Sequence, residues 1–533
     1  MDEYRSKTWR QVTWIAGVWV LVAASLIAVG CAPQGSPEGE TTAAAEAEPA
    51  QPTQMKMTTA IPESITTPDR VETSIGTFEF FDGVPTKKST EMAYDFLDKV
   101  NAYKALLSTI PTVSINELRR GQAAVGAKTS NQICIYDTLM DSKSLVLTGN
   151  TSTMYALGFL DLEKDGPTVI ELPPGMLGVL NDMGFLHMTD LGAAGPDKGK
   201  GGKYLVLPPG YEGDVPKGYF VVQSETYNVW NFMRGYLDKG VKAASDNIRN
   251  NLKVYPLSRA ADQPTMEFIN VSGKEMNTVL PTDYTFFERI NEVVQKEPEG
   301  FLDLEVLGLL RSIGIVKGQP FNPDARMRKI LEDAAAIAEA TARTITYYPR
   351  VAGQYAWGDM EGAWVVPFAD NDSTWIENSA RKIENQIYYH YNCIVVTPAM
   401  AAAPDPGKGS EYVFASLDTE KKILEGSKSY KMTLPANVPV ADFWAITLYD
   451  TQTRSQLQTD QQFPTLDTYT EGLQKNEDGS YTIYFGPEAP AGQESNWLQT
   501  IPGKSWFIAL RIYGPEQPWI DQSWKPGEIE LVQ

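Results

Sequence analysis

Carboxylates and arginines are the residues of this chain whose types and positions could do chemistry. The 533 residues include 67 aspartates and glutamates and 46 lysines and arginines, but two histidines. Two carboxylates can hydrolyse a glycosidic bond, because one donates a proton while the other attacks or activates water. Asp161 and Asp450 are our candidates for such a pair, since each follows a run of apolar, strand-forming residues. We predict Arg454 as a third catalytic residue and Arg234 as a bidentate ligand of an anionic substrate.

Each of these residues also has a structural interpretation. An aspartate at the end of a strand commonly forms a turn or a cap, and an arginine commonly forms a structural ion pair. Aromatic residues crowd the last part of the chain, and Trp444 among them is a candidate for stacking on a sugar ring. Core packing explains most such residues in a β-sandwich, so both interpretations stay open.

Metal and nucleophile chemistry have little support in the sequence. Zinc sites commonly use two or three imidazoles, and the chain offers His187 and His390 alone, which we interpret as packed side chains. There is no Gly-x-Ser-x-Gly motif for a nucleophilic serine. The Gly-rich stretch at residues 195–202 lacks the spacing of a phosphate-binding loop. We therefore predict no metal site and no cofactor.

The start of the chain has the pattern of an export signal. Arg5, Lys7 and Arg10 precede residues 12–29, which carry no charge and are rich in Val, Ala, Leu and Ile. That run suits either the apolar part of a signal peptide or an uncleaved helical anchor. It ends on small residues before Cys31, an arrangement that resembles the lipobox of bacterial lipoproteins, with Cys31 as the lipidated residue. We predict an exported lipoprotein of the cell envelope, periplasmic or on the cell surface.

The composition after Cys31 and the overall charge limit the partners. Residues 32 to about 70 are dominated by Ala, Pro, Glu, Thr, Gln and Ser, so we expect a flexible tether on the membrane. The formal net charge of −21 argues against nucleic acid or an anionic membrane surface as the main partner. Cys134 and Cys393 form either one disulfide or two buried thiols.

Apolar spacing indicates the elements that position these residues. A helix is expected from Met92 to Leu107, ended by Pro111. Short apolar runs separated by Gly, Pro and Asp then indicate a β-rich unit. A second helix is expected over residues 226–251. The middle of the chain is helical, and Asp324 together with the Asn-Pro before it predicts the start of a long helix.

The sequence of the C-terminal part again predicts strands. Residues 442–449, 481–485 and 505–513 are apolar on both faces, as in the core of a sandwich. We predict an α+β, β-dominated fold. It consists of an N-terminal β-rich domain with helices, a helical linker and a C-terminal antiparallel jelly-roll-like β-sandwich.

The predicted boundaries follow the changes of composition along the chain. They are a lipoprotein signal peptide at residues 1–30, a tether at 31–70, an N-terminal β-rich domain at 71–260, a helical linker at 261–350 and a C-terminal β-sandwich at 351–533.

Two stretches of the chain resemble a known bacterial family. The segments LTGNTSTMY at 147–155 and LPPGY at 207–211 resemble the domain of unknown function 1254. The segments DFWAITLYD at 442–450, YFGP at 484–487 and WKPG at 524–527 resemble its usual partner, the domain of unknown function 1214. The resemblance implies an exported bacterial protein with two β-rich domains joined by helices, and it implies no particular reaction.

The resemblance adds one residue to the predicted site. Asn150 lies within the first quoted motif, and we predict that it binds substrate together with Arg234 and Trp444. Relatives typically have Asn-x-Asp-Thr at this place, whereas this chain has Ser152 in the position of the aspartate. A role that needs a carboxylate there is therefore not carried over.

The two β-rich domains are expected to form a cleft for an extracellular organic molecule. We favour a carbohydrate or other glycan-like ligand and, for an enzyme, its hydrolysis by the carboxylates above. The alternative is a non-catalytic binding or assembly protein of the envelope, in which the chain could form a homo-oligomer. No nucleic-acid partner is predicted.

Overall fold

A computed structural model describes residues 55–358, 362–402 and 405–532. The predicted signal peptide and the predicted lipidation site Cys31 lie outside the described residues. The chain divides into two compact units, residues 1–67 and residues 68–533. In the first unit the described residues 55–67 are all exposed and include the short 3-10 helix η1 (Glu63–Ile65). Within the described ranges, no helix is both long enough and apolar enough to cross a membrane.

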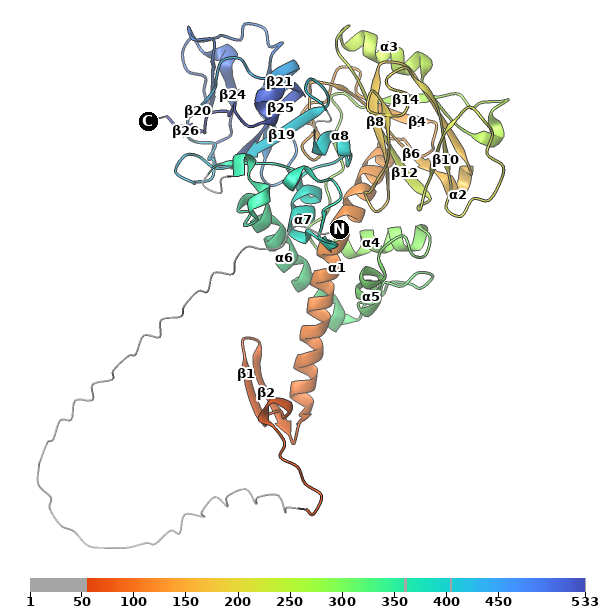
Figure 1. The fold of residues 1–533 in the computed structure, drawn as a ribbon, viewed down its shortest axis with the longest axis vertical. Helices are drawn as coiled ribbons and strands as arrows, with labels where there is room; N and C mark the ends of the chain where they lie inside the picture. Colours follow the sequence, from red (N-terminus) through yellow and green to blue (C-terminus); the bar gives the residue numbers. More distant parts are fainter. Residues whose placement is uncertain (1–54, 359–361, 403–404, 533) are drawn as a thin grey trace, which may run out of the picture. The chain divides into compact units, whose positions relative to one another are not determined.

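The second unit begins with a small antiparallel sheet and one long helix (Figure 1). The strands are β1 (Arg70–Thr73), β2 (Gly76–Phe81) and β3 (Val84–Pro85). Helix α1 (Lys87–Ala124) follows, and the expectation that it ends at Pro111 is wrong, because the helix continues through that residue. A proline inside a helix costs about 3 kcal/mol. Burial of Ile110 and Val113 on either side of it offsets that cost.

Four further helices pack against α1 or against one another (Figure 1). They are α4 (Thr285–Lys296), α5 (Leu304–Ser312), α6 (Ala325–Tyr347) and α7 (Ile383–Asn392). The predicted start of the long helix is confirmed, because Asp324 caps α6 by accepting a hydrogen bond from the Met327 N–H at 2.8 Å. The remaining helices of the second unit are α2 (Leu162–Asp165), α3 (Val241–Asn251), α8 (Pro398–Ala401), α9 (Gln517–Ile520), η2 (Leu257–Arg259), η3 (Ala352–Gln354), η4 (Ala356–Gly358), η5 (Ala369–Asn371) and η6 (Glu494–Asn496).

The N-terminal β-rich part consists of two sheets that share an apolar core. The six-stranded sheet has the order β14 (Glu267–Asn270), β4 (Gln132–Ile135), β6 (Met154–Asp161), β12 (Asn228–Gly235), β8 (Met176–Asp182), β9 (His187–Gly192). The four-stranded sheet has the order β11 (Phe220–Gln223), β10 (Gly202–Leu207), β7 (Thr168–Leu172), β13 (Lys253–Pro256). A two-stranded sheet pairs β5 (Ser144–Leu145) with β15 (Met276–Asn277).

The helix expected over residues 226–251 is wrong in its first half. Residues 228–235 form strand β12, which lies between β6 and β8, and only α3 is helical. Every residue of β12 is buried, because one face of its sheet covers the core shared with the four-stranded sheet and the other faces α1. A strand buried on both faces does not alternate apolar and polar residues, so its sequence resembles a helix.

The C-terminal part is a sandwich of two sheets, as the apolar strands predict. The five-stranded sheet has the order β16 (Trp364–Val365), β19 (Ser410–Ala415), β25 (Trp506–Pro515), β21 (Val440–Asp450), β22 (Thr465–Asp467). The four-stranded sheet has the order β24 (Trp497–Gln499), β23 (Tyr481–Gly486), β20 (Tyr430–Leu434), β26 (Glu530–Leu531). A hairpin joins β17 (Ile376–Glu377) to β18 (Ala380–Arg381). The α+β, β-dominated fold is confirmed, and the jelly-roll order of strands stays a prediction.

One large core connects these parts. It contains residues from the outer faces of the six-stranded and five-stranded sheets and from helices α1, α4, α6 and α7. Phe232 of β12 and Phe414 of β19 both belong to it, although 182 positions separate them in the chain. Both β-rich parts are therefore packed on one helical centre, and residues distant in sequence meet there.

Candidate functional site

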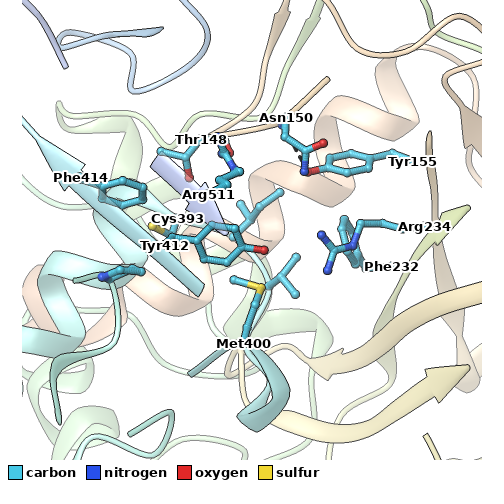
Figure 2. Close-up of a pocket in the computed structure, with 13 residues that line it drawn as sticks. Thr148, Asn150, Tyr155, Phe232, Arg234, Cys393, Met400, Tyr412, Phe414 and Arg511 are labelled. Atoms are coloured by element: carbon cyan, nitrogen blue, oxygen red, sulfur yellow. Dashed lines mark hydrogen bonds between the residues drawn. The ribbon is translucent and has the colours of Figure 1, made fainter. Parts of the chain in front are cut away.

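A cavity lies where the six-stranded sheet, the five-stranded sheet and the segment after α7 meet (Figure 2). Counted as space for the centres of water molecules, its volume is about 40 Å³, which is room for a few waters. The lining contains no Asp or Glu. It consists of Thr148, Asn150, Tyr155, Phe232, Arg234, Pro367, Cys393, Ile394, Val395, Met400, Tyr412, Phe414 and Arg511.

Each of the two sheets contributes one tyrosine and one arginine to this cavity. In the N-terminal sheet Tyr155 of β6 is paired directly with Arg234 of β12. In the C-terminal sheet Tyr412 of β19 is paired directly with Arg511 of β25. Side chains of directly paired residues lie on the same face of a sheet. The strand registers therefore place two tyrosines and two arginines in the same cavity, where Figure 2 shows the Tyr412 hydroxyl pointing toward Arg234.

Both arginines are buried and lack a carboxylate partner among the described residues. Arg234 is 6 % exposed and Arg511 is 4 % exposed. Arg511 Nη2 donates a hydrogen bond to the Thr148 carbonyl oxygen at 2.6 Å. Its Nη1 and the Nε of Arg234 have no partner in the described part of the chain. Because a guanidinium cannot give up its charge in a protein, two positive charges are buried here without a counter-charge.

Tyrosines are the titratable groups that surround both guanidinium groups. Burial acts to lower the pKa of Arg234 and of Arg511, but the surrounding tyrosines outweigh it and raise both, with Tyr412 contributing most for Arg234 and Tyr449 most for Arg511. Burial in turn raises the pKa of Tyr155 and of Tyr513. These two phenols stay neutral at physiological pH, so they supply hydrogen bonds to the site and no negative charge.

The hydroxyl of Tyr155 is oriented by Asn150. Its oxygen accepts hydrogen bonds from the Asn150 Nδ2 at 2.9 Å and from the Asn150 backbone N–H at 3.3 Å. The proton of that hydroxyl is left to donate to another group. Asn150 is itself fixed, because its Oδ1 accepts hydrogen bonds from the backbone N–H of Ser152 at 2.9 Å and of Thr153 at 3.1 Å.

Backbone strain is concentrated in the walls of the cavity. Thr148 has a φ of 41° and Val395 a φ of 74°. Positive φ is an outlier for β-branched residues, costs about 1–3 kcal/mol and is typical of functional sites. The Thr148 conformation is held by a hydrogen bond from its N–H to the Arg454 carbonyl oxygen at 2.8 Å. At the next residue the Tyr449 hydroxyl donates to the Gly149 carbonyl oxygen at 2.8 Å.

Family models match the two β-rich parts. Residues 130–256 match DUF1254 and residues 409–517 match DUF1214, both described as proteins of unknown function. The chain carries a DUF1254 domain followed by a DUF1214 domain. This confirms the resemblance seen in the sequence. Tyr155 and Arg234 therefore lie in the DUF1254 domain, Tyr412 and Arg511 lie in the DUF1214 domain, and the remaining wall comes from the segment between them.

Two solved structures are similar to the chain. The VPA0106 protein from Vibrio parahaemolyticus is 18 % identical with a TM-score of 0.49, and the match covers 82 % of this chain and 100 % of that one. An uncharacterised protein from Burkholderia cenocepacia is 13 % identical with a TM-score of 0.37, covering 84 % of this chain and 97 % of that one. A search of curated proteins found no significant match.

The structure brings together two of the six predicted catalytic and substrate-binding residues. Arg234 and Asn150, both in the DUF1254 domain, line the cavity. Asp161 lies outside the lining at the end of β6, where it caps α2 and forms an ion pair with Lys296 at 3.3 Å. Asp450 ends β21, also outside the lining, accepts a hydrogen bond from the Gln452 N–H at 2.6 Å and pairs with Lys504.

Arg454 and Trp444 belong to the DUF1214 domain and lie outside the cavity lining. Arg454 is 1 % exposed, lies 4.0 Å above the Tyr391 ring and donates from Nε to the Tyr391 carbonyl oxygen at 3.2 Å. The carbonyl oxygen of Arg454 accepts a hydrogen bond from the Thr148 N–H, so Arg454 stabilises a residue of the cavity lining. Trp444 is buried in the core of the sandwich and packs against Tyr481.

Both remaining cysteines are free and buried. Burial raises the pKa of the Cys393 thiol to about 12, so this lining residue stays protonated and is a poor nucleophile. Among the residues that the structure describes, no group of His, Cys, Asp and Glu is arranged to hold a metal ion. The cavity therefore offers guanidinium and phenol donors rather than a nucleophile or a metal site.

Three residues of the cavity, Tyr155, Tyr412 and Arg511, are not among those predicted from the sequence. The signal for Arg511 is visible in retrospect, since it is the single charged residue within the apolar strand β25. Arg234 stands alone in the same way in β12. A lone arginine within a fully buried strand indicates a buried charge that needs a partner. The two tyrosines carry no comparable signal, because strand pairing alone places them beside the arginines.

Proposed function

We propose that the protein binds a small organic anion in the cavity between its DUF1254 and DUF1214 domains. One observation carries the proposal: Arg234 and Arg511 reach the cavity from different domains, and neither has a carboxylate partner among the described residues. Burying a charge without a partner is costly. An anionic ligand removes that cost, and arginine is well suited to bind a carboxylate or phosphate.

The experiment is thermal unfolding of the purified full-length protein with added salts of small anions. A ligand that binds the native state raises its melting temperature, so we expect at least one organic anion to do so beyond an equal concentration of sodium chloride. The variants Arg234→Met and Arg511→Met should each weaken binding by about 2 kcal/mol, roughly 30-fold. Equal shifts in the wild type and both variants would contradict the proposal.

The location of the protein is a separate proposal. We propose that it is exported and attached to the membrane through a lipid on Cys31, on the strength of the apolar segment and the small residues before that cysteine. The test is membrane fractionation with metabolic labelling by a fatty acid. We expect label in the wild type and none after Cys31→Ser.

Hydrolysis of a glycan-like substrate stays a prediction from the sequence. Asp161 and Asp450 are both engaged in turns or caps and in ion pairs with lysines. A binding assay with propionate and a turnover assay with a neutral glycoside would separate the two ideas. Binding of propionate alone favours the arginine cavity, whereas turnover of a neutral glycoside that is lost in Asp161→Asn and Asp450→Asn favours the carboxylates.

A different observation favours assembly with a second copy as an alternative function. Phe81 of β2, Val84 of β3 and Tyr94 of α1 are 83 %, 64 % and 60 % exposed, and these elements contact one another. Exposed apolar patches commonly mark interaction sites. Light scattering of the full-length protein should then show a dimer that Phe81→Ser with Val84→Ser converts to a monomer. A wild-type monomer would exclude this alternative.

A further inference from the structure

We infer that the anion is a monocarboxylate with a short apolar body, bound with its carboxylate on the arginines and its body on the apolar side chains of the lining. The inference rests on the proposed function and makes the ligand class specific. It depends on three properties of the cavity: the grouping of the positive charges, the apolar part of the lining and the small volume.

The two positive charges of the cavity border the same tyrosine. The guanidinium carbon of Arg511 lies 5.6 Å from the centre of the Tyr412 ring, and Figure 2 shows the hydroxyl of that tyrosine pointing toward Arg234. The other residues of the described lining are uncharged, so a dicarboxylate that reached beyond the arginines would place its second charge against uncharged side chains. A ligand with a single charged end fits this lining better.

The hydrogen-bond donors beside the two arginines suit a carboxylate. Arg234 Nε and Arg511 Nη1 are buried without partners among the described residues, and the Tyr155 hydroxyl has a proton left to donate. A carboxylate has about four lone-pair sites and accepts bidentate guanidinium donors. Each of its two oxygens can therefore accept one arginine hydrogen bond, and one of them can also accept the tyrosine proton.

The other part of the lining is apolar. Phe232, Phe414, Val395 and Met400 lie in the same cavity as the arginines, together with Ile394 and Pro367. Phosphate and sulfate present no apolar surface to such a wall, so binding them would leave it without a contact. The methylene groups of an organic carboxylate would be buried there, at about 0.8 kcal/mol for each.

The volume of the cavity limits the length of the body. Space for the centres of water molecules amounts to about 40 Å³, which is room for a few waters. We therefore expect the body of the ligand to be a chain of only a few carbon atoms. Butyrate is therefore a suitable probe, and butyramide is its matched control because it has nearly the same shape without the charge.

The test is isothermal titration of the purified full-length protein with butyrate, butyramide, succinate and phosphate. Butyrate should bind at least tenfold more tightly than each of the other three. Arg234→Met should weaken butyrate at least tenfold, and Met400→Gln should weaken butyrate while leaving acetate unchanged, because acetate has no chain to lay on that wall.

The outcomes separate this inference from the proposed function. Tight binding of phosphate or succinate with weak binding of butyrate would overturn the monocarboxylate while retaining the anion site. Equal binding of butyrate and butyramide would show that charge is not recognised and would overturn both. Binding of none of the four probes, in wild type and variants alike, would also overturn both.

Discussion

Two groups of arginines in this protein differ in the side chains that surround them. On the helical side, Arg120 and Arg289 lie between α1 and α4 and form ion pairs with Glu117 and Glu292 at 2.9–3.3 Å. At the domain boundary, Arg234 and Arg511 are more deeply buried, and their neighbours are tyrosines. With 67 acidic residues in the chain, carboxylates are not scarce, yet the described part places none in the cavity lining.

The difference in partners indicates a different role for each group of arginines. An arginine held between two glutamates has its charge balanced within the protein, so it joins one helix to another and binds nothing further. An arginine held among phenols keeps its charge available. The paired cluster is therefore structural, whereas the cavity arginines are suited to an external anion. Identical substitutions in the two groups should consequently have different effects.

The largest expected effect is the loss of the paired cluster. Arg289→Met removes the ion pair from Arg289 Nε to Glu117 Oε1 at 3.0 Å and leaves a carboxylate whose pKa burial already raises. We expect the free energy of unfolding to fall by about 3 kcal/mol. Urea unfolding at pH 7 measures it, with Arg311→Met on the exposed face of α5 as the control. An unchanged midpoint would mean that this cluster is not structural.

The second largest expected effect is the pH dependence of stability caused by the buried His390, whose side chain, unlike that of an arginine, can become neutral. His390 is fully buried among Phe185, Trp375 and Tyr389, and neither ring nitrogen has a hydrogen-bond partner within the described ranges. Burial lowers its pKa to about 3. The folded state favours the neutral form, so the contribution of His390 to stability is complete above pH 6.5 and falls as the pH decreases. At pH 5 the loss is about 2 kcal/mol.

His390→Phe tests this contrast between a histidine and an arginine. The variant cannot be protonated there, so its unfolding free energy should fall less between pH 7 and pH 5 than that of the wild type, by about 2 kcal/mol. Parallel pH profiles for the wild type and His390→Phe would show that the ring is protonated without penalty.

The third expected effect, on stability, is opposite in sign to that of Arg289→Met. Arg234→Met removes a buried charge without a carboxylate partner, so the ligand-free protein should change by no more than about 1 kcal/mol, in the stabilising direction. The same urea unfolding at pH 7 measures this change. A loss as large as that of Arg289→Met would show that Arg234 already has an internal counter-charge, and it would remove the basis of the anion site.

The sequence predicted the architecture better than the site. Export signals, the helix start at Asp324 and the apolar strands of the sandwich are local patterns, and the two described elements among them are present in the structure. Pro111 was misleading because tertiary packing outweighs a local helix-breaking preference. Strand β12 was misleading because burial on both faces removes the alternation by which strands are recognised.

The candidate site depends on contacts that no local pattern contains. Arg234 and Asn150 were predicted on their own, but Tyr412 and Arg511 join them only through strand pairing in a second sheet. The carboxylates were chosen by their place after apolar strands, and that place also suits a cap, which is what Asp161 forms. Composition could not distinguish a catalytic carboxylate from a helix cap, because both roles need an aspartate at the end of a strand.

The smallest effect separates two tyrosines beside the arginines. The Tyr513 hydroxyl is buried and has no partner in the part of the chain that the structure describes, whereas the Tyr155 hydroxyl accepts two hydrogen bonds from Asn150. Tyr155→Phe leaves two donors unsatisfied and should lower stability by about 1–2 kcal/mol. Tyr513→Phe removes an unsatisfied group, so the ligand-free protein should change by less than about 0.5 kcal/mol. Thermal unfolding of both variants tests this, and a larger loss in Tyr513→Phe would mean that its hydroxyl has a partner in the native protein.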